Sequence, residues 1–216
     1  PYPLMKRITW WPQAWLGLTF NWGALLGWAV VRGDLDPAAF VLYAAGFFWT
    51  LGYDTIYAHQ DKEDDALVGI KSTARLFGAI SRPWVAGFYA VSIALLAVTG
   101  WIEALSWPFW VGLALGAAHL AWQALTIDFD DAKDCLAKFR ANRDFGLIIF
   151  AAAIAGRALR ETILRQSNMG PNSDLQLDGD RLIITHENAS HVIDLASLPT
   201  NTHGYVLSAE ETYDPP

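Results

Sequence analysis

The sequence predicts an all-α protein, a multispanning bundle of about five transmembrane helices that continues into a small soluble tail with irregular and β structure. Three observations predict this fold class. Hydrophobic residues make up 53% of the chain. Eleven tryptophans lie mostly at the ends of apolar runs, where a membrane interface favours rings that carry a polar group. Charged residues are scarce inside these runs and clustered between them.

Five apolar segments are expected to span the membrane, because a helix needs about 20 mostly apolar residues to cross about 30 Å of hydrocarbon. The expected spans are residues 8–31, 37–57, 84–105, 107–127 and 145–159. The first contains Gly17, Gly23 and Gly27, small residues that allow helices to approach closely in lipid. The fifth is short and contains Arg157, so it fits the pattern least.

Lysine and arginine gather in alternate loops, which predicts the orientation in the membrane. They precede the first span and lie between spans two and three and between spans four and five: Lys6, Arg7, Lys62, Lys71, Arg75, Arg82, Lys133, Lys138, Arg140 and Arg143. Because such residues concentrate on the cytoplasmic side, the loop after span two is predicted to be cytoplasmic. A bacterial inner membrane is expected, with the mitochondrial inner membrane as the alternative. Arg157, Arg160 and Arg165 conflict with this orientation.

The chain is expected to consist of a membrane domain, residues 1–165, and a polar soluble tail, residues 166–216. The tail is rich in Asn, Ser, Asp, Gly and Pro. Its short apolar runs at 175–177 and 182–185 flank an Asp-Gly-Asp sequence, which predicts a small hairpin.

Composition also excludes some functions. The net charge of −7 and the lack of a basic stripe argue against nucleic acid as a partner. Cys135 is the single cysteine, so it cannot form an intrachain disulfide and is expected to be an inert thiol. The chain opens with Pro1 rather than Met, and it is therefore expected to be a fragment or a processed product.

The acidic run from Asp54 to Asp65 is the most informative part of the sequence. If it lies on a helix that continues the second span, each residue advances by about 100°. Asp61 then falls about 20° to one side of Asp54, and Asp65 about 20° to the other. Tyr57 lies near the same face, whereas Glu63 points away. The expected result is one acidic stripe of three carboxylates.

Carboxylates that crowd in this way repel one another, and a divalent cation removes the conflict. Mg²⁺ takes one or two carboxylates and fills its other positions with water and phosphate oxygens. Lys71 and Arg75 follow closely and are candidates to bind the same phosphate groups. A charge run between two spans is, however, most often a solvated loop, and that interpretation stays open. Residues 139–144, with Arg140 and Arg143, are expected to close over the site as a basic lid.

Two strings of residues carry a resemblance to a known family. The acidic run reads Tyr53-Asp54-Thr55-x-Tyr57-Ala58-x-x-Asp61-x-x-Asp64-Asp65-x-x-x-Gly69-Ile70-Lys71-Ser72-Thr73-Ala74-x-x-Phe77-Gly78. The chain opens with Tyr2-Pro3-x-Met5-Lys6-Arg7-x-Thr9-x-x-Pro12-Gln13-x-x-Leu16-Gly17. The first resembles the second aspartate-rich motif of the UbiA superfamily, and the second resembles the entry to a later transmembrane helix of that family. Within the superfamily, the match is closest to the 4-hydroxybenzoate polyprenyltransferases of ubiquinone biosynthesis.

The resemblance implies an all-α bundle in a lipid bilayer that binds Mg²⁺, a polyprenyl diphosphate and 4-hydroxybenzoate. It implies that Asp61 and Asp65 are Mg²⁺ ligands and that Asp54 supports the metal or the acceptor. It also implies that Lys71 binds the diphosphate with the help of Arg75. Tyr57 is expected to contact the substrate.

The sequence departs from the family in one respect, because the first aspartate-rich motif is not present among its residues. The chain alone is therefore expected to be inactive. Two explanations stay open: a separate N-terminal half that carries this motif as a partner, or a truncated chain. Two other functions also stay open, namely a UbiA-type enzyme with another aromatic or quinone acceptor and a non-catalytic membrane module.

Overall fold

The computed structural model describes the backbone of residues 2–168, 174–178, 181–186 and 189–194. The chain divides into two compact units, Pro1–Arg160 and Glu161–Pro216. The expected assignment of 166–216 as a separate domain stays a prediction.

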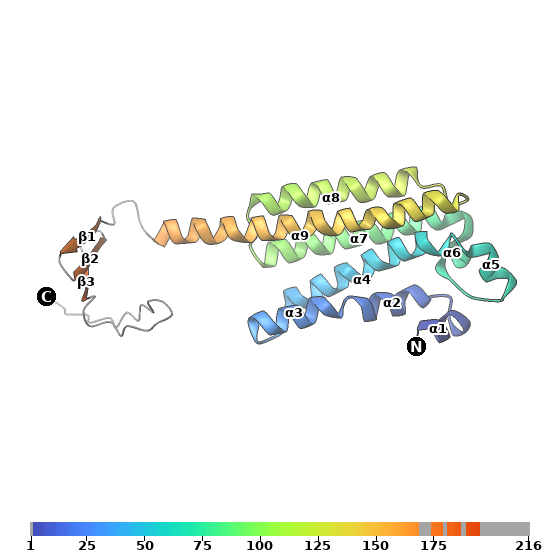
Figure 1. Cartoon of the computed structure of the whole chain (residues 1–216), viewed down its shortest axis with the longest axis horizontal. Coiled ribbons are helices and arrows are strands. Elements are labelled where there is room, and N and C mark those ends of the chain that lie inside the picture. Colours follow the sequence, from blue (N-terminus) through green and yellow to red (C-terminus); the bar gives the residue numbers. More distant parts are fainter. Residues whose placement is uncertain (1, 169–173, 179–180, 187–188, 195–216) are drawn as a thin grey trace. The chain divides into compact units, whose positions relative to one another are not determined.

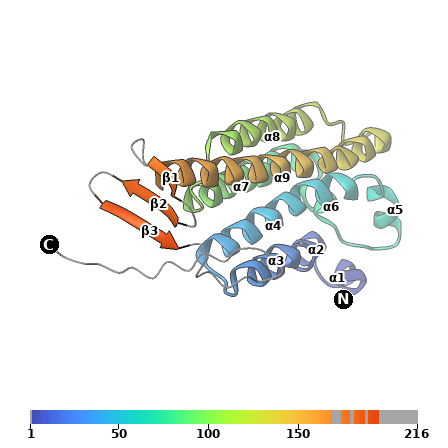
Figure 2. The ribbon, with the colours of Figure 1, turned by 60° about the vertical axis from the view of Figure 1, so that its left-hand side comes forward.

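The first unit is helical, which confirms the predicted membrane bundle. Its longer helices run side by side, with α2 and α3 along one side of α4 (Figures 1 and 2). The helices of the described chain are α1 (Tyr2–Ile8), α2 (Pro12–Phe20), α3 (Trp22–Arg32), α4 (Pro37–Ala58), α5 (Lys62–Leu67), α6 (Thr73–Phe77), the 3₁₀ turn η1 (Gly78–Ile80), α7 (Ser81–Ile102), α8 (Trp107–Thr126) and α9 (Ala132–Asn168).

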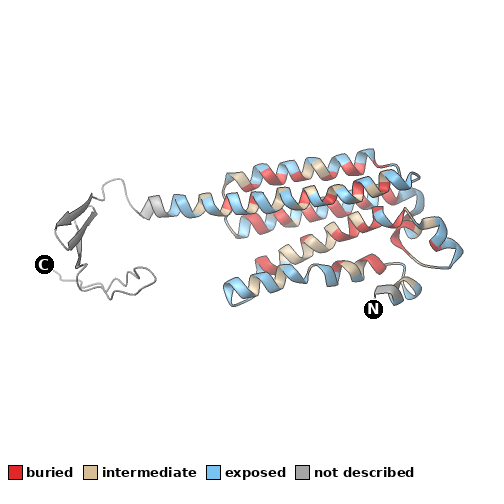
Figure 3. Ribbon diagram, viewed as in Figure 1, coloured by how far each residue is buried: buried red, intermediate tan, exposed pale blue. Residues whose placement is uncertain are grey.

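Large apolar side chains cover much of the outer surface of the bundle. Val30 is 85% exposed and Trp101 is 77% exposed, an arrangement that suits lipid and not water. Buried positions alternate with exposed ones along each long helix (Figure 3). Within the described residues, two helical stretches are long and apolar enough to cross a membrane, namely Pro12–Arg32 and Thr73–Ile102. The number of five spans stays a prediction.

The first expected span is not one continuous helix, because α2 ends at Phe20 and α3 begins at Trp22. The amide of Asn21 causes the break. It donates to the carbonyl oxygen of Gly17 at 2.7 Å and to the hydroxyl of Thr50 at 3.0 Å, so it competes with the helical backbone for hydrogen bonds. The Asn21 side chain lies where a Cβ on Gly46 would have to be.

Two other expectations about the spans also need correction. Gly17 contacts α4 closely, since a Cβ there would lie 2.8 Å from the ring of Phe47, but Gly23 and Gly27 have no described atom within 4 Å of that position. The fifth span is part of α9, which is 37 residues long. Residues 132–144 contain no Gly or Pro that would end a helix.

A buried polar network joins the four long helices. The Nε1–H of Trp49 in α4 donates to Oδ1 of Asn142 in α9 at 2.8 Å. The Nδ2 group of Asn142 donates to Oε1 of Gln123 in α8 at 2.9 Å, and the hydroxyl of Tyr89 in α7 donates to the same oxygen at 3.0 Å. In lipid, such bonds and close packing hold helices together, because apolar burial between helices adds little.

Arg157, which conflicted with the expected orientation, takes part in an ion pair at one end of the bundle. Glu103 follows α7 and its carboxylate lies 2.5 Å from the guanidinium of Arg32 and 3.5 Å from that of Arg157. The negative charge of Glu103 therefore balances Arg32 and Arg157, at the end of the bundle where the distribution of Lys and Arg predicts few basic residues.

The second unit contains a three-stranded antiparallel sheet in the order β1 (Asp174–Asp178), β2 (Arg181–His186) and β3 (Ala189–Asp194). Leu177 pairs with Leu182, which confirms the predicted hairpin. The third strand was not predicted, and residues 179–180 of the predicted turn lie outside the described residues.

The contact between α4 and α7 gives a test of the packing. A Cβ on Gly52 would clash with the ring of Tyr89, whose hydroxyl belongs to the polar network. We expect Gly52→Ala to destabilise the fold by about 1–3 kcal/mol and to lower the thermal unfolding midpoint in detergent. Gly87→Ala on the same α7 is the control, since no described atom lies within 4 Å of its added Cβ. Equal midpoints for the two variants would contradict this packing.

Candidate functional site

The acidic motif occupies two helices and the turn between them. The helix α4 ends at Ala58, and the N–H groups of His59 and Gln60 bond three residues back at 3.1 and 3.0 Å. Asp61 then occupies the N-cap position of α5, without a capping hydrogen bond from its side chain. The expected single helix from Asp54 to Asp65 is therefore wrong.

Contacts with distant residues produce this turn. The imidazole of His59 is buried, its Nε2 lies 2.8 Å from the hydroxyl oxygen of Ser81, and its ring packs on Phe129 at 4.4 Å. Lys62 forms an ion pair with Asp130 at 2.6 Å. Burial, together with the charge of Lys62, lowers the pKa of His59 to about 4. The ring is therefore neutral near pH 7.

Asp61 and Asp65 keep their expected relation, although Asp54 does not join them. The N–H of Asp65 donates to the carbonyl oxygen of Asp61 at 2.8 Å, which places the two residues one helical turn apart. Asp54 is buried in α4 with 6% of its surface exposed. In the described part of the chain, no group of three or more His, Cys, Asp and Glu side chains could hold a metal ion. The expected stripe of three carboxylates is therefore not formed.

Asp65 is the electrostatic centre of the site. Its side chain is buried, with 7% exposed. Burial raises the pKa of Asp65 above its ordinary value, Asp61 and Asp64 raise it further, and the positive charges of Lys6 and Arg75 act in the opposite direction. Asp61 is exposed. The buried carboxylate of Asp65 thus lies within the electrostatic influence of two cations, and the exposed Asp61 precedes it by one helical turn.

The predicted cations follow on a segment that folds back toward Asp65, with Lys71 in the loop before α6 and Arg75 within α6. Gly69 has a φ of +72°, which favours glycine at this turn. The guanidinium of Arg75 donates to the carbonyl oxygens of Ile70 and Asp65, the latter at 3.3 Å. The backbone N–H of Lys71 donates to the carbonyl oxygen of Lys6 at 2.8 Å, so α1 is held against this loop.

The ring of Trp10 lies close to both predicted cations. Its centre is 5.9 Å from Nζ of Lys71 and 5.5 Å from Cζ of Arg75. Cations at this range are attracted to the face of an aromatic ring. Sequence reasoning did not assign Lys6 or Trp10 to the site. For Lys6, the signal was the Lys-Arg pair just before the first span, which was used only to predict the orientation in the membrane.

An aromatic wall extends from the acidic turn along α4. Trp49, Tyr53 and Tyr57 follow one another at intervals of four residues and therefore share a helix face. Phe139 of α9 packs against Tyr57 at 4.7 Å and against Tyr53 at 5.8 Å. Tyr57 is 39% exposed, so part of its ring is available for contact.

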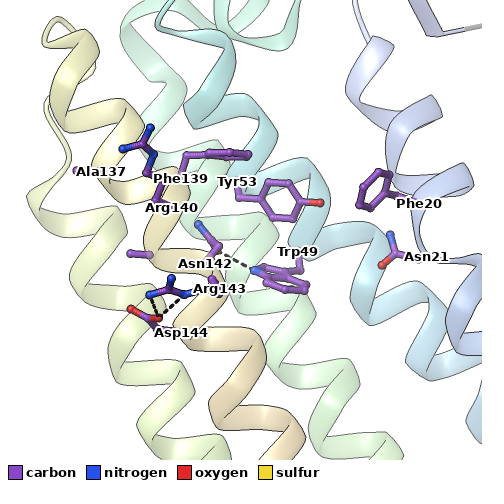
Figure 4. A pocket seen from close by; sticks show the side chains of 11 residues that line it. Phe20, Asn21, Trp49, Tyr53, Ala137, Phe139, Arg140, Asn142, Arg143 and Asp144 are labelled. Atoms are coloured by element: carbon purple, nitrogen blue, oxygen red, sulfur yellow. Dashed lines mark hydrogen bonds and ion pairs between the residues drawn. The ribbon is translucent and has the colours of Figure 1, made fainter.

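A cavity of about 750 Å³ lies against this wall (Figure 4). It is lined by Phe20, Asn21, Trp49, Tyr53, Ala137, Phe139, Arg140, Ala141, Asn142, Arg143 and Asp144. Residues 139–144 belong to the continuous helix α9 and form a side of the cavity, so the expected basic lid is wrong. Arg143 pairs with Asp144 at 3.0 Å. A second cavity of about 310 Å³ shares Asn21 and Trp49 with the first and is otherwise lined mostly by apolar side chains.

A comparison with protein families identifies the class of protein. The model of the UbiA prenyltransferase family matches residues 1–153. The chain belongs to this family.

The chain is similar to proteins named 4-hydroxybenzoate polyprenyltransferase, mitochondrial. It is 51% identical to the one from Arabidopsis thaliana over 74% of this chain and 39% of that protein. It is 45% identical to the one from Homo sapiens over 81% of this chain and 47% of that protein. It is also 50% identical to 4-hydroxybenzoate geranyltransferase 2 of Lithospermum erythrorhizon, over 72% of this chain and 51% of that protein. The chain thus spans about half the length of the curated relatives it matches, or less. No solved structure matches it.

Cys135, near the start of α9, provides a test of local structure. Its side chain is fully buried, and burial together with the charge of Asp134 raises the pKa of the Cys135 thiol to about 11. A thiol reacts as the thiolate, so the reactive fraction at pH 8 is about 100-fold smaller than for a pKa of 9. We expect very slow alkylation by iodoacetamide at pH 8, a rate that rises up to about pH 11, and rapid alkylation in denaturant. Rapid alkylation of the folded chain at pH 8 would contradict this environment.

Proposed function

We propose that this chain forms the C-terminal part of a Mg²⁺-dependent enzyme that transfers a polyprenyl group from a polyprenyl diphosphate to 4-hydroxybenzoate in ubiquinone biosynthesis. The names of its relatives support the two substrates. The observation that carries the proposal is the pair Asp61 and Asp65, one helical turn apart, with Lys6 and Arg75 beside the buried carboxylate.

The donor chemistry of this pair fits Mg²⁺. Two carboxylates are as many as this ion commonly takes from a protein, and its remaining positions go to water and phosphate oxygens. When bound, Mg²⁺ supplies a Lewis acid that neutralises negative charge on the diphosphate. Asp61 and Asp65 are the proposed ligands, and Asp54 supports the metal or the acceptor from α4.

The cations bind the diphosphate in this proposal. Lys71 and Arg75 lie on the loop next to Asp65, and their hydrogen bonds to backbone carbonyl oxygens leave further donors for phosphate oxygens. In the reaction, the C–O bond between the prenyl group and the diphosphate breaks, and the diphosphate leaves with the bonding electrons. The prenyl carbon bonds to the ring carbon ortho to the hydroxyl group, and this ring carbon then loses its hydrogen as a proton. The faces of Tyr57 and Phe139 favour positive charge on the prenyl group.

The two cavities fit an amphiphilic substrate. The larger one is lined by aromatic rings and by Arg140 and Arg143, whereas the smaller one continues past Trp49 between apolar side chains such as Leu42, Leu96 and Ile149. In this proposal, the hydrocarbon tail occupies these cavities, while the diphosphate binds at Asp61, Asp65, Lys71 and Arg75, which line neither of them.

The membrane location is proposed on the same basis. The acidic turn and the cationic loop belong to the segment with many Lys and Arg residues, so we assign them to the cytoplasmic side. The bacterial inner membrane and the mitochondrial inner membrane are the two alternatives. The first aspartate-rich motif of the family is supplied either by upstream sequence or by a separate chain, and we expect the 216 residues alone to bind diphosphate without turnover.

Binding of a non-hydrolysable analogue tests this proposal. We expect farnesyl thiolodiphosphate to bind the detergent-solubilised chain in the presence of Mg²⁺ and not in the presence of EDTA, as measured by isothermal titration calorimetry. Asp61→Asn and Asp65→Asn are expected to weaken binding at least about tenfold, since each removes a charge-assisted ligand.

Glu63→Gln provides the matched control, because Glu63 is exposed on the same helix and is not among the charges that shift the pKa of Asp65. Its affinity should equal that of the wild type. Binding that does not require Mg²⁺, or equal losses in all three variants, would favour a non-catalytic membrane module. Turnover by the purified chain with 4-hydroxybenzoate would overturn the expectation that it is inactive alone.

A further inference from the structure

Three buried polar side chains from separate elements meet at the start of α6, between Lys71 and Arg75 in the sequence. The exposed fraction is 1% for Gln13 in α2, 0% for Thr55 in α4 and 0% for Thr73 in α6. The hydroxyl oxygens of Thr55 and Thr73 lie 2.7 Å apart, and the backbone N–H of Thr73 donates to Oε1 of Gln13 at 3.2 Å. We call this set the Gln13–Thr55–Thr73 clamp.

The clamp satisfies groups that would otherwise be buried without partners. The first N–H groups of a helix have no partner within that helix, and Thr73 is the first residue of α6. Gln13 accepts from its N–H, and the hydroxyl of Ser72 accepts from the N–H of Arg75 at 3.3 Å. A buried donor that loses its acceptor destabilises the fold, so the clamp specifies one position for the start of α6.

The helix α6 cannot hold that position by itself. It contains five residues, and a helix of this length is unstable without tertiary contacts. Gly69 and Gly78 bound the segment with positive φ values of +72° and +49°. The segment therefore depends on its contacts with α2 and α4 for a defined conformation.

Lys71 and Arg75 lie two residues before and two residues after Thr73, so the clamp controls both cations at once. Thr55 follows Asp54 in α4, the helix that leads into the turn at Asp61. The 2.7 Å contact between Thr55 and Thr73 thus sets the distance between the cationic loop and the acidic turn.

We propose that Gln13, Thr55 and Thr73 are positioning residues, which hold Lys71 and Arg75 where they bind the diphosphate. This inference rests on the proposed function and adds three residues that do not touch the substrate themselves. The clamp acts through geometry alone, since none of its side chains carries a charge.

The test compares variants of Thr73 in the full chain, with Mg²⁺ and inorganic pyrophosphate as the probe. Thr73→Val removes the hydroxyl and keeps the shape of the side chain, and we expect its Kd to rise about tenfold, as one lost buried hydrogen bond implies. Thr73→Ser restores the hydroxyl and should bind within about twofold of the wild type. Thr55→Val should resemble Thr73→Val, and the double variant should show less than the sum of the two effects, because both remove the same bond.

Thr99→Val is the matched control for a general loss of stability. Thr99 is buried in α7 with 7% exposed, and its hydroxyl donates to the carbonyl oxygen of Leu95 in its own helix at 3.0 Å. It should leave the Kd for pyrophosphate unchanged, whatever its effect on the unfolding midpoint. Hydrogen exchange at residues 69–77 should accelerate in Thr73→Val and not in Thr99→Val.

The outcomes distinguish a failure of the clamp from a failure of the proposed function. A wild-type chain that binds pyrophosphate with Mg²⁺, together with a Thr73→Val chain of unchanged Kd, would overturn the clamp and leave the proposed function intact. Equal weakening by Thr99→Val would show a general structural effect and would also overturn the clamp. A wild-type chain that binds no pyrophosphate would overturn the proposed function, and with it the purpose assigned to these three residues.

Discussion

The buried network of Trp49, Tyr89, Gln123 and Asn142 is the interaction on which the bundle depends. It joins α4, α7, α8 and α9 through hydrogen bonds of 2.8 to 3.0 Å. In an apolar interior, a broken bond leaves a polar group without a partner, so this network selects one arrangement of the four helices. Trp49 also lines both cavities, and the same network therefore shapes the space available to a substrate.

The helix α4 connects this framework to the chemistry. One of its faces carries Trp49, Tyr53 and Tyr57 toward α9, while Asp54 and Thr55 are buried nearby. Where α4 ends, the chain turns through His59 to Asp61. The segment with Lys71 and Arg75 then folds back, and the guanidinium of Arg75 donates to the carbonyl oxygen of Asp65. A single rigid helix thus relates the aromatic wall, the carboxylate pair and the cationic loop.

Charged side chains in this protein are balanced by neighbouring residues of opposite charge. At one end, Asp65 is buried between cations and carboxylates whose effects on its pKa oppose one another. Elsewhere, Glu103 compensates both Arg32 and Arg157. An ion pair of this kind allows basic residues on a side where the distribution of Lys and Arg alone predicts few, which explains why the orientation rule failed to account for Arg157.

The sequence by itself determined the helical membrane class, the family and the pair Asp61 and Asp65. Apolar runs and residue spacing are local properties, and a helical turn keeps residues four apart on one face whatever surrounds it. The hairpin from Leu175 to Thr185 was predictable for the same reason, since its strands are neighbours in the chain.

Only the tertiary structure decided where α4 stops and which residues support the site. His59 turns away from the expected helix because its partners, Ser81 and Phe129, come from other elements. The charge of Lys6 acts on the pKa of Asp65, and Gln13 accepts a hydrogen bond from Thr73. Both relations require that α1 and α2 pack against residues 65–73. These residues are about 60 positions apart in sequence from their partners, and no local period of a helix or strand relates residues at that separation.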